Sequence, residues 1–253
     1  MPCRVAIVQS SYVPWRGAFA MIARCDAFIF LDSVQFTRRD WRTRNRIKTP
    51  QGPLWLSIPV RQKGNFHAPI DAMEIADESW SIRHGRSIEG AYRRAGGFAD
   101  AIGGIQDAYA AIAQETNLSR VNQHLTQAVC AMLGIRTRFL RDVEVLPRAT
   151  LAALDPTARL VALAKAVGAH CYLSGPSARA YLDEAAFRDQ GIAVEWMSYA
   201  HLPPYPQLWG AFEPAVSILD PLLTLGPAGA RAVLGAEPAA AQPLPAACVG
   251  VQR

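Results

Sequence analysis

A chain of 253 residues, of which 51% are hydrophobic and 19% charged, can bury a large apolar core and lacks the composition of a disordered protein. No apolar run approaches the roughly 18 residues that a membrane span needs, and no secretory leader precedes the first strand, so we expect a cytoplasmic protein without membrane contact. The 5 cysteines are scattered and include no C-x-x-C pair, which argues against a disulfide framework and against a zinc site.

The net charge of +5 comes from one short segment. Residues 38–48, here called the basic segment, hold six basic side chains and one acidic one, whereas the rest of the chain carries as many acidic as basic residues. Five of the six are arginines, and guanidinium groups bind phosphate and carboxylate oxygens in bidentate pairs. We therefore expect the basic segment to bind a specific anion. Two alternatives stay open: a solvated hairpin, and a nucleic-acid surface in which Trp41 and Phe36 stack on bases.

The N-terminal part of the chain predicts a βαβ unit followed by a hairpin. Apolar runs at 4–8 and 27–32 indicate two buried strands, with a short helix expected over about 16–24 between them. The basic segment leads into a hairpin over 46–60, which turns at a Pro/Gly pair. A strand, a helix and a strand in this order are typical of a parallel sheet that is covered on both faces.

Polar side chains follow both predicted strands. Gln9 and Ser10 come directly after the first strand, whereas Asp32 ends the second one and Gln35 follows it. Ligands of parallel α/β sheets gather at the carboxyl ends of the strands. We therefore expect these four side chains at one rim of the sheet. Asp32 is the candidate base or metal-linked carboxylate, with the arginines of the basic segment beside it.

The rest of the chain alternates between helical and extended patterns. We expect a strand at 70–76, helices near 79–95, 98–115 and 118–133, a strand near 136–145, a helix near 156–167, and strands at 170–174 and 192–199. On the first of these helices, His84 shares one face with apolar side chains. This histidine is therefore expected at the edge of the core rather than in catalysis.

These elements predict one α/β domain over residues 1–235. Its core is a parallel or mixed doubly wound sheet with a β-hairpin excursion, and the helices at about 78–133 form an inserted subdomain or cap. Residues 236–253 are rich in alanine and proline and are expected to form a disordered tail. Short signatures for nucleotides or metals (G-x-G-x-x-G, G-x-x-x-x-G-K-[ST] and H-E-x-x-H) are absent, so no cofactor and no metal are assigned.

Four stretches have a specialised composition that α/β packing alone does not require. They are PWRGAF at 14–19, LDSVQF at 31–36 continuing into WRTRNRIK at 41–48, YLSGPSARAYL at 172–182, and YPQ at 205–207 followed by SILD at 217–220. Together they resemble the WbqC-like protein family over roughly residues 4–235. The resemblance implies enzymes of polysaccharide or specialised-metabolite biosynthesis, some of which are candidates for transferring acyl or aminoacyl groups to amino sugars.

The chain departs from the family pattern at several positions near the expected rim. Many family members have His or Met where this chain has Val8, and a second aspartate where it has Ser33. The other replacements are Ser10 for a proline, Ala18 for a tyrosine, Asp40 for a glycine and Thr43 for an asparagine. The run Arg44-Asn45-Arg46-Ile47-Lys48 is intact, which implies an altered substrate within a retained binding mode.

Candidate roles fall on residues of these stretches and of the rim. The catalytic candidates are Asp32, Gln9 and Gln35. The candidates for binding substrate or phosphate are Arg42, Arg44, Asn45, Arg46, Lys48, Trp15, Ser174, Gly175, Ser177, Arg179, Tyr205 and Gln207. The turn at 174–179 leads into a helix, with Ser177 as the expected N-cap. Its backbone N–H groups are expected to bind an anion. The alternative is an ordinary strand-to-helix turn whose cap is satisfied within the protein. Asp220 is expected to orient a neighbouring side chain or to cap the preceding turn.

The leading hypothesis is an enzyme that transfers an acyl or aminoacyl group to an amine on a nucleotide-activated sugar or a related metabolite. In this hypothesis the arginines hold phosphate and Asp32 manages the proton. The expected partner is a phosphate-bearing small molecule, either a nucleotide sugar or an activated acyl donor. Two alternatives are a non-catalytic module that binds a sugar nucleotide or an acidic partner protein, and an RNA-binding transferase that uses aminoacyl-tRNA. The sequence assigns no oligomeric state.

Overall fold

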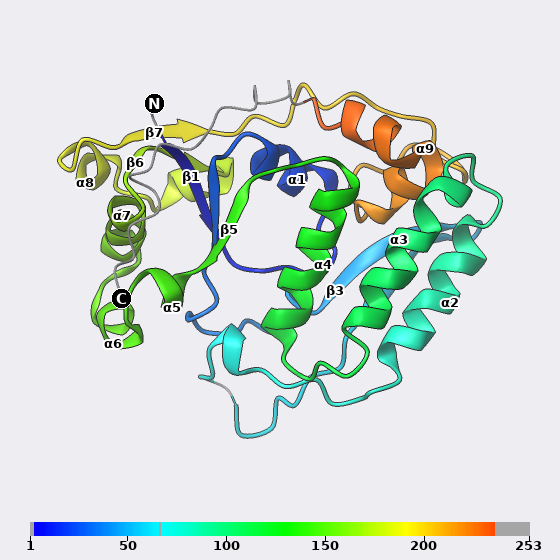
Figure 1. Cartoon of the computed structure of the whole chain (residues 1–253), viewed down its shortest axis with the longest axis horizontal. Coiled ribbons are helices and arrows are strands. Elements are labelled where there is room, and N and C mark those ends of the chain that lie inside the picture. Colours follow the sequence, from blue (N-terminus) through cyan, green and yellow to red (C-terminus); the bar gives the residue numbers. More distant parts are fainter. Residues whose placement is uncertain (1–2, 66, 236–253) are drawn as a thin grey trace.

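The structure, a computed structural model, describes residues 3–65 and 67–235 (Figure 1). Its strands are β1 (Cys3–Val8), β2 (Ala27–Phe30), β3 (Arg44–Thr49), β4 (Gly52–Ser57), β5 (Arg138–Arg141), β6 (Ala169–Ser174) and β7 (Ala193–Trp196). Its helices are α1 (Arg16–Ala23), α2 (Trp80–Tyr92), α3 (Phe98–Ala111), α4 (Leu118–Met132), α5 (Asp142–Val145), α6 (Arg148–Ala153), α7 (Pro156–Ala166), α8 (Glu184–Arg188) and α9 (Leu219–Ala232), with 3-10 turns η1 (Ile70–Ala72) and η2 (Pro176–Ala180). Among the helices of these two ranges, none has the length and apolar composition for crossing a membrane. The tail predicted at 236–253 lies outside the described residues.

Five parallel strands form the main sheet in the order β5-β2-β1-β6-β7. From β1 the chain adds β2 and β5 on one side, and it then returns to add β6 and β7 on the other. The point where the strand order reverses therefore lies between β1 and β6. In open α/β sheets, ligands bind in the crevice outside the carboxyl ends of the strands at this switch point.

Helices cover both faces of the main sheet, because each strand places alternate side chains on opposite faces. On one face, Ile7 and Ile29 pack with α6, α7 and α8. On the other, Ala6 and Phe30 pack with α1, α4 and α9. Figure 1 shows α6 and α7 on the opposite side of the strands from α1, α4 and α9. The prediction of a doubly wound sheet is therefore confirmed, in its parallel form.

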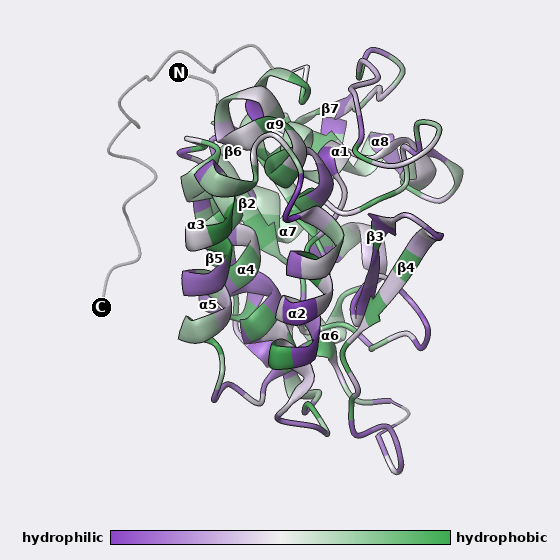
Figure 2. Ribbon diagram, turned by 90° about the vertical axis from the view of Figure 1, so that its right-hand side faces the viewer, coloured by the Kyte–Doolittle hydropathy of each residue, from purple (hydrophilic) through white to green (hydrophobic). Residues whose placement is uncertain are grey.

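A second core lies beneath the β3–β4 hairpin, which forms an antiparallel sheet of its own. Ile47 and Leu56 point from the hairpin into this core, where they meet side chains of α2, α3 and the first half of α4. The buried residues of α2 include Trp80, His84, Ile88 and Ala91. Figure 2 shows the hairpin beside α2 and apart from the parallel strands. The second half of α4 packs on the main sheet, so this helix belongs to both cores.

Two of the predicted strands are wrong, one wholly and one in part. Residues 70–76 contain the η1 turn and only isolated bridges at Glu74 and Ile75. The apolar side chains of that stretch are buried in the second core. Its backbone N–H groups, however, donate to carbonyls of separate loops, so the stretch has the burial pattern of a strand but no partner strand. The strand expected near 136–145 ends at Arg141, because the Glu144 carboxylate accepts the Arg141 N–H and begins α5.

Candidate functional site

A buried carboxylate joins the carboxyl ends of β1 and β2 to α4. Asp32 is 2% exposed, and its Oδ1 accepts the Ser10 backbone N–H at 2.8 Å. Its Oδ2 accepts the Ser119 hydroxyl and, at 3.0 Å, the Gln123 amide. We call these four residues the Asp32 cluster. Because the carboxylate is buried and already holds three donors, its contacts favour a positioning role over the proton-accepting role that the sequence suggested.

The donors from α4 were not predicted from the sequence. Ser119 and Gln123 are four residues apart and therefore lie on one face of the helix, with Asn122 beside them. Asn122 is fully buried, and its Nδ2 donates to the Arg42 backbone carbonyl at 2.8 Å. The sequence feature that could have revealed them is a stripe of polar side chains on the side of α4 that otherwise carries apolar residues and faces the core.

Arg42 is the arginine of the basic segment that reaches the predicted rim. Its side chain is 11% exposed, and Nη1 donates to Gln9 Oε1 at 2.6 Å. Its Nη2 lies 3.7 Å from the Asp40 carboxylate. Burial lowers the pKa of Arg42, and the nearby carboxylates of Asp40 and Asp32 oppose that shift. An arginine remains charged throughout the physiological range, so the Arg42–Gln9 pair places a cation next to the switch point.

The other basic side chains do not converge on Asp32. Arg44 and Arg46 lie over the indole of Trp55, with guanidinium carbons 4.5 and 5.4 Å from the ring centroid. Arg46 also donates to the Ala215 carbonyl. The amide of Asn45 donates to two backbone carbonyls of the 12–13 loop, which is a structural contact. Arg42 thus reaches the rim, whereas Arg44 and Arg46 lie over Trp55 of the hairpin.

Lys48, Tyr205 and Gln207 belong to a second polar cluster around Asp220. Lys48 Nζ donates to Gln207 Oε1 at 2.6 Å. The buried Asp220 carboxylate accepts from the hydroxyls of Tyr205 and Tyr92, at 2.7 and 2.8 Å, and from the Gln207 amide at 3.0 Å. Burial raises the pKa of Asp220 against these hydrogen bonds. The cluster fixes the 203–215 loop to α9 and β3, and Asp220 orients its neighbours as expected.

The turn at 174–179 lies at the carboxyl end of β6, across the switch point from β1. Ser174 is buried, and Gly175 rather than Ser177 occupies the cap position of η2. The predicted N-cap is therefore wrong, because Pro176 takes the first position of the turn and Ser177 is an exposed residue within it. Arg179 stacks on Trp196 at 4.9 Å. No hydrogen bond or ion pair of the described residues joins this turn to the basic segment.

Trp15 is partly buried and supports the start of α1. Its ring meets the ring of Tyr199 edge-on, with centroids 4.8 Å apart. A Cβ at position 17 would lie 2.2 Å from the Trp15 ring, which explains the glycine of the Pro-Trp-Arg-Gly stretch. Trp15 therefore packs within the protein in this structure.

Gln35 is exposed and is joined to neither Arg42 nor Gln9 by any hydrogen bond or ion pair of the described residues. It lines a hollow of about 270 Å³ together with Ser33, Arg148 and Arg159. The Ser33 N–H donates to the buried Asp142 carboxylate at 2.9 Å. Burial raises the pKa of Asp142, and the nearby Asp32 raises it further against the hydrogen bonds from Ser33. The aspartate of the family pattern at position 33 would bring a third carboxylate close to those of Asp32 and Asp142.

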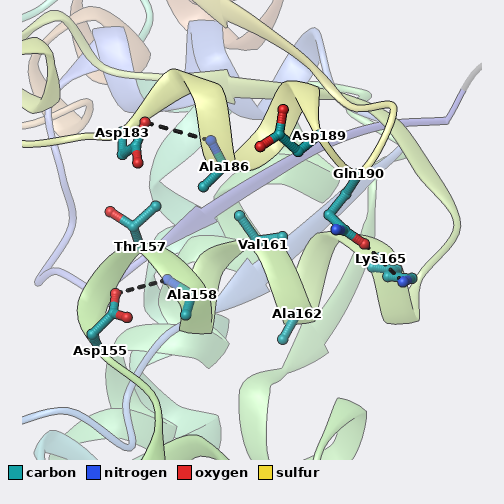
Figure 3. A pocket seen from close by; sticks show the side chains of 10 residues that line it. All are labelled: Asp155, Thr157, Ala158, Val161, Ala162, Lys165, Asp183, Ala186, Asp189 and Gln190. Atoms are coloured by element: carbon teal, nitrogen blue, oxygen red, sulfur yellow. Dashed lines mark hydrogen bonds between the residues drawn. The ribbon is translucent and has the colours of Figure 1, made fainter.

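A larger hollow, of about 460 Å³, lies between α7 and α8 (Figure 3). Two of its acids cap helices: Asp155 accepts the Ala158 N–H at 2.9 Å, and Asp183 accepts the Ala186 N–H at 3.4 Å. None of the candidate residues from the sequence lines this groove. We therefore place the candidate site at the rim around the Arg42–Gln9 pair. Within the described ranges, no group of three His, Cys, Asp or Glu side chains is arranged to hold a metal ion.

Comparison with known proteins relates the chain to one family and to a mycobacterial protein. The sequence profile of the WbqC-like protein family matches residues 9–232. The uncharacterized protein Rv1507c of Mycobacterium tuberculosis is 46% identical over 225 residues, which cover 88% of this chain and 94% of that protein. No solved structure matches the chain significantly.

Proposed function

The chain belongs to the WbqC-like protein family, and from that premise we propose that it is an enzyme that binds a phosphate-bearing small molecule beside the carboxyl ends of β1 and β2. We propose transfer of an acyl or aminoacyl group to an amine as its reaction, within polysaccharide or specialised-metabolite biosynthesis. The observation that carries the proposal is the Arg42–Gln9 pair. Among the described residues the nearly buried Arg42 side chain donates one hydrogen bond, although a guanidinium has five N–H donors.

An anionic ligand suits this environment for two physical reasons. A nearly buried cation with unused donors is stabilised by an oxyanion that accepts several of them at once. The site also lies next to the switch point of a doubly wound sheet, where such folds bind their ligands. Phosphate oxygens accept from Arg42 in this proposal, and the same charge stabilises negative charge that develops during acyl transfer.

The neighbours of Arg42 have supporting roles in the proposal. Asp32 holds the loop after β1 through Ser10, and α4 holds the backbone of Arg42 through Asn122. Asp40 is the counter-ion of Arg42 in this structure. Partial burial would raise the pKa of Asp40, but a hydrogen bond from Thr37 and the charge of Arg42 lower it. An incoming phosphate therefore competes with Asp40 for the guanidinium.

A thermal-shift screen of nucleotide sugars, acyl-CoA thioesters and aminoacyl-tRNA tests the proposal. A ligand that stabilises the wild type should lose its effect in Arg42→Gln, which removes the cation. The effect should grow in Asp40→Asn, because the competing carboxylate is gone, and should be unchanged in Arg188→Gln, an exposed arginine of α8. The ligand is then incubated with acyl donors and amine acceptors, and the products are identified by mass spectrometry.

The outcomes separate the proposal from its alternatives. A ligand that depends on Arg42 but gives no product with any donor and acceptor would favour a non-catalytic binding module. Stabilisation by tRNA alone, with affinity that falls steeply as salt rises, would favour an RNA-using transferase. Equal stabilisation of the wild type and Arg42→Gln would contradict the anion site itself.

A further inference from the structure

Two exposed tryptophans lie together at the start of the hairpin. Trp41 is 44% exposed and Trp55 is 43% exposed, and their ring centroids are 5.7 Å apart with a 34° angle between the planes. Large aromatic side chains are normally buried, so a contiguous exposed pair is an informative departure. Phe36, which the sequence also suggested for stacking, is buried in the second core and takes no part.

Two cationic groups lie over one of the exposed indoles, that of Trp55. Arg44 and Arg46 lie over the Trp55 ring, and the next residue after Trp41 is Arg42 of the candidate site. The backbone carbonyl of Trp41 accepts the Tyr12 N–H at 2.9 Å, which ties the aromatic pair to the loop that follows β1. The structure therefore joins an aromatic surface, a cluster of arginines and the rim of the sheet.

We infer that the Trp41–Trp55 surface binds the base of a nucleotide whose phosphates lie on Arg42 and Arg44. This inference rests on the proposed function and names the class of its phosphate-bearing substrate. Nucleobases stack on indole rings, and the guanidinium groups beside the rings supply charge for the attached phosphates. The phosphate end of the nucleotide then points toward Gln9 and the switch point, where the group attached to the nucleotide reacts.

The arrangement favours one nucleotide over a nucleic-acid strand or a protein partner. The two indoles contact each other and form a single stacking surface, whereas proteins that bind single strands present several aromatic side chains along a basic groove. Outside the basic segment the chain carries no net charge, so a long phosphate backbone would find little more to bind. A protein interface needs an apolar centre far larger than two indoles bordered by arginines.

Binding of nucleoside diphosphates and of inorganic pyrophosphate, measured by calorimetry and by quenching of tryptophan fluorescence, tests the inference. The probes are ADP, CDP, GDP, UDP and dTDP. At least one should bind the wild type about fivefold or more tightly than pyrophosphate does, which corresponds to the lower end of what one stacked base contributes. Trp41→Leu should abolish this advantage and leave the affinity for pyrophosphate unchanged.

Leu54→Ala is the matched control, because Leu54 is 42% exposed on β4 next to Trp55 but has no aromatic ring. It should bind every probe as the wild type does. If no nucleoside diphosphate binds better than pyrophosphate, or if Trp41→Leu keeps the advantage, the base site is refuted while the anion site stands. If pyrophosphate also fails to bind, the proposed function fails together with the inference. Affinity for oligouridylate that rises with length and falls steeply with salt would refute the single-nucleotide site in favour of RNA.

Discussion

Replacing Asp32 by asparagine should weaken folding as well as activity. The asparagine keeps one acceptor for the Ser10 N–H, and the Ser119 hydroxyl rotates to donate elsewhere or to accept, but the new NH₂ group opposes the Gln123 amide donor. Of the three hydrogen bonds to the carboxylate, the one from Gln123 is lost, the one from Ser10 becomes neutral, and the one from Ser119 is reversed or lost. Since hydrogen bonds to charged groups contribute about 1.5–3 kcal/mol, we expect Asp32→Asn to lose about 2–4 kcal/mol of unfolding free energy.

Urea denaturation at pH 7, followed by circular dichroism, measures this loss. Asp107→Asn is the control, because Asp107 is exposed on α3 and its replacement should change the unfolding free energy by less than about 0.5 kcal/mol. The stability of the variant distinguishes two roles for Asp32. A residue that only accepts a substrate proton would leave stability near that of the control when it is replaced. An Asp32→Asn variant as stable as the wild type would therefore refute the positioning role.

Two further perturbations test the cores. Burial lowers the pKa of His84 from 6.5 to about 4. The stability that the neutral ring contributes is therefore complete above pH 6.5 and is lost as the pH falls toward 4. Between pH 7 and 4.5, the wild type should lose about 2.5 kcal/mol more unfolding free energy than His84→Asn in urea titrations. Equal losses would contradict this assignment. Gly97→Ala should cost about 2 kcal/mol or more in thermal denaturation, because its Cβ would lie 1.9 Å from the Gly226 backbone N. Gly103→Ala, whose new Cβ would meet open space within α3, should be as stable as the wild type or more so. A similar result for Gly97→Ala would contradict the close contact between the start of α3 and α9.

The main sheet was predictable because its strands are short apolar runs separated by helical patterns. Most side chains of β1, β2 and β6 are buried on both faces, so these strands appear in the sequence as nearly continuous apolar runs. The stretch at 70–76 failed for the opposite reason. Its apolar residues are separated by polar or exposed ones because single side chains insert into the second core from an irregular backbone. The local sequence has the same pattern as a strand that pairs with a neighbour, so the two cannot be told apart.

The candidate site could be proposed from the sequence only where strand ends or charge mark its residues. Gln9 and Asp32 were named because they follow strands, and Arg42 was named because of its charge; the structure brings Gln9 and Arg42 into contact. The α4 donors to Asp32 were missed, since their role depends on a helix that packs against the strand ends from far along the chain. The directions of the arginine side chains were not predicted either. The residue at which β3 begins decides which arginines point to the rim and which point to Trp55.

The Asp32 cluster determines which positions of the rim can be exchanged without weakening the fold. It anchors the ends of two neighbouring strands and one helix with interior hydrogen bonds, so its members are constrained by folding. Val8 and Ser33 flank it without donating to the Asp32 carboxylate. Replacements at these two flanking positions should therefore cost less unfolding free energy than replacements within the cluster, so the surface of the rim can change while the framework beneath it persists.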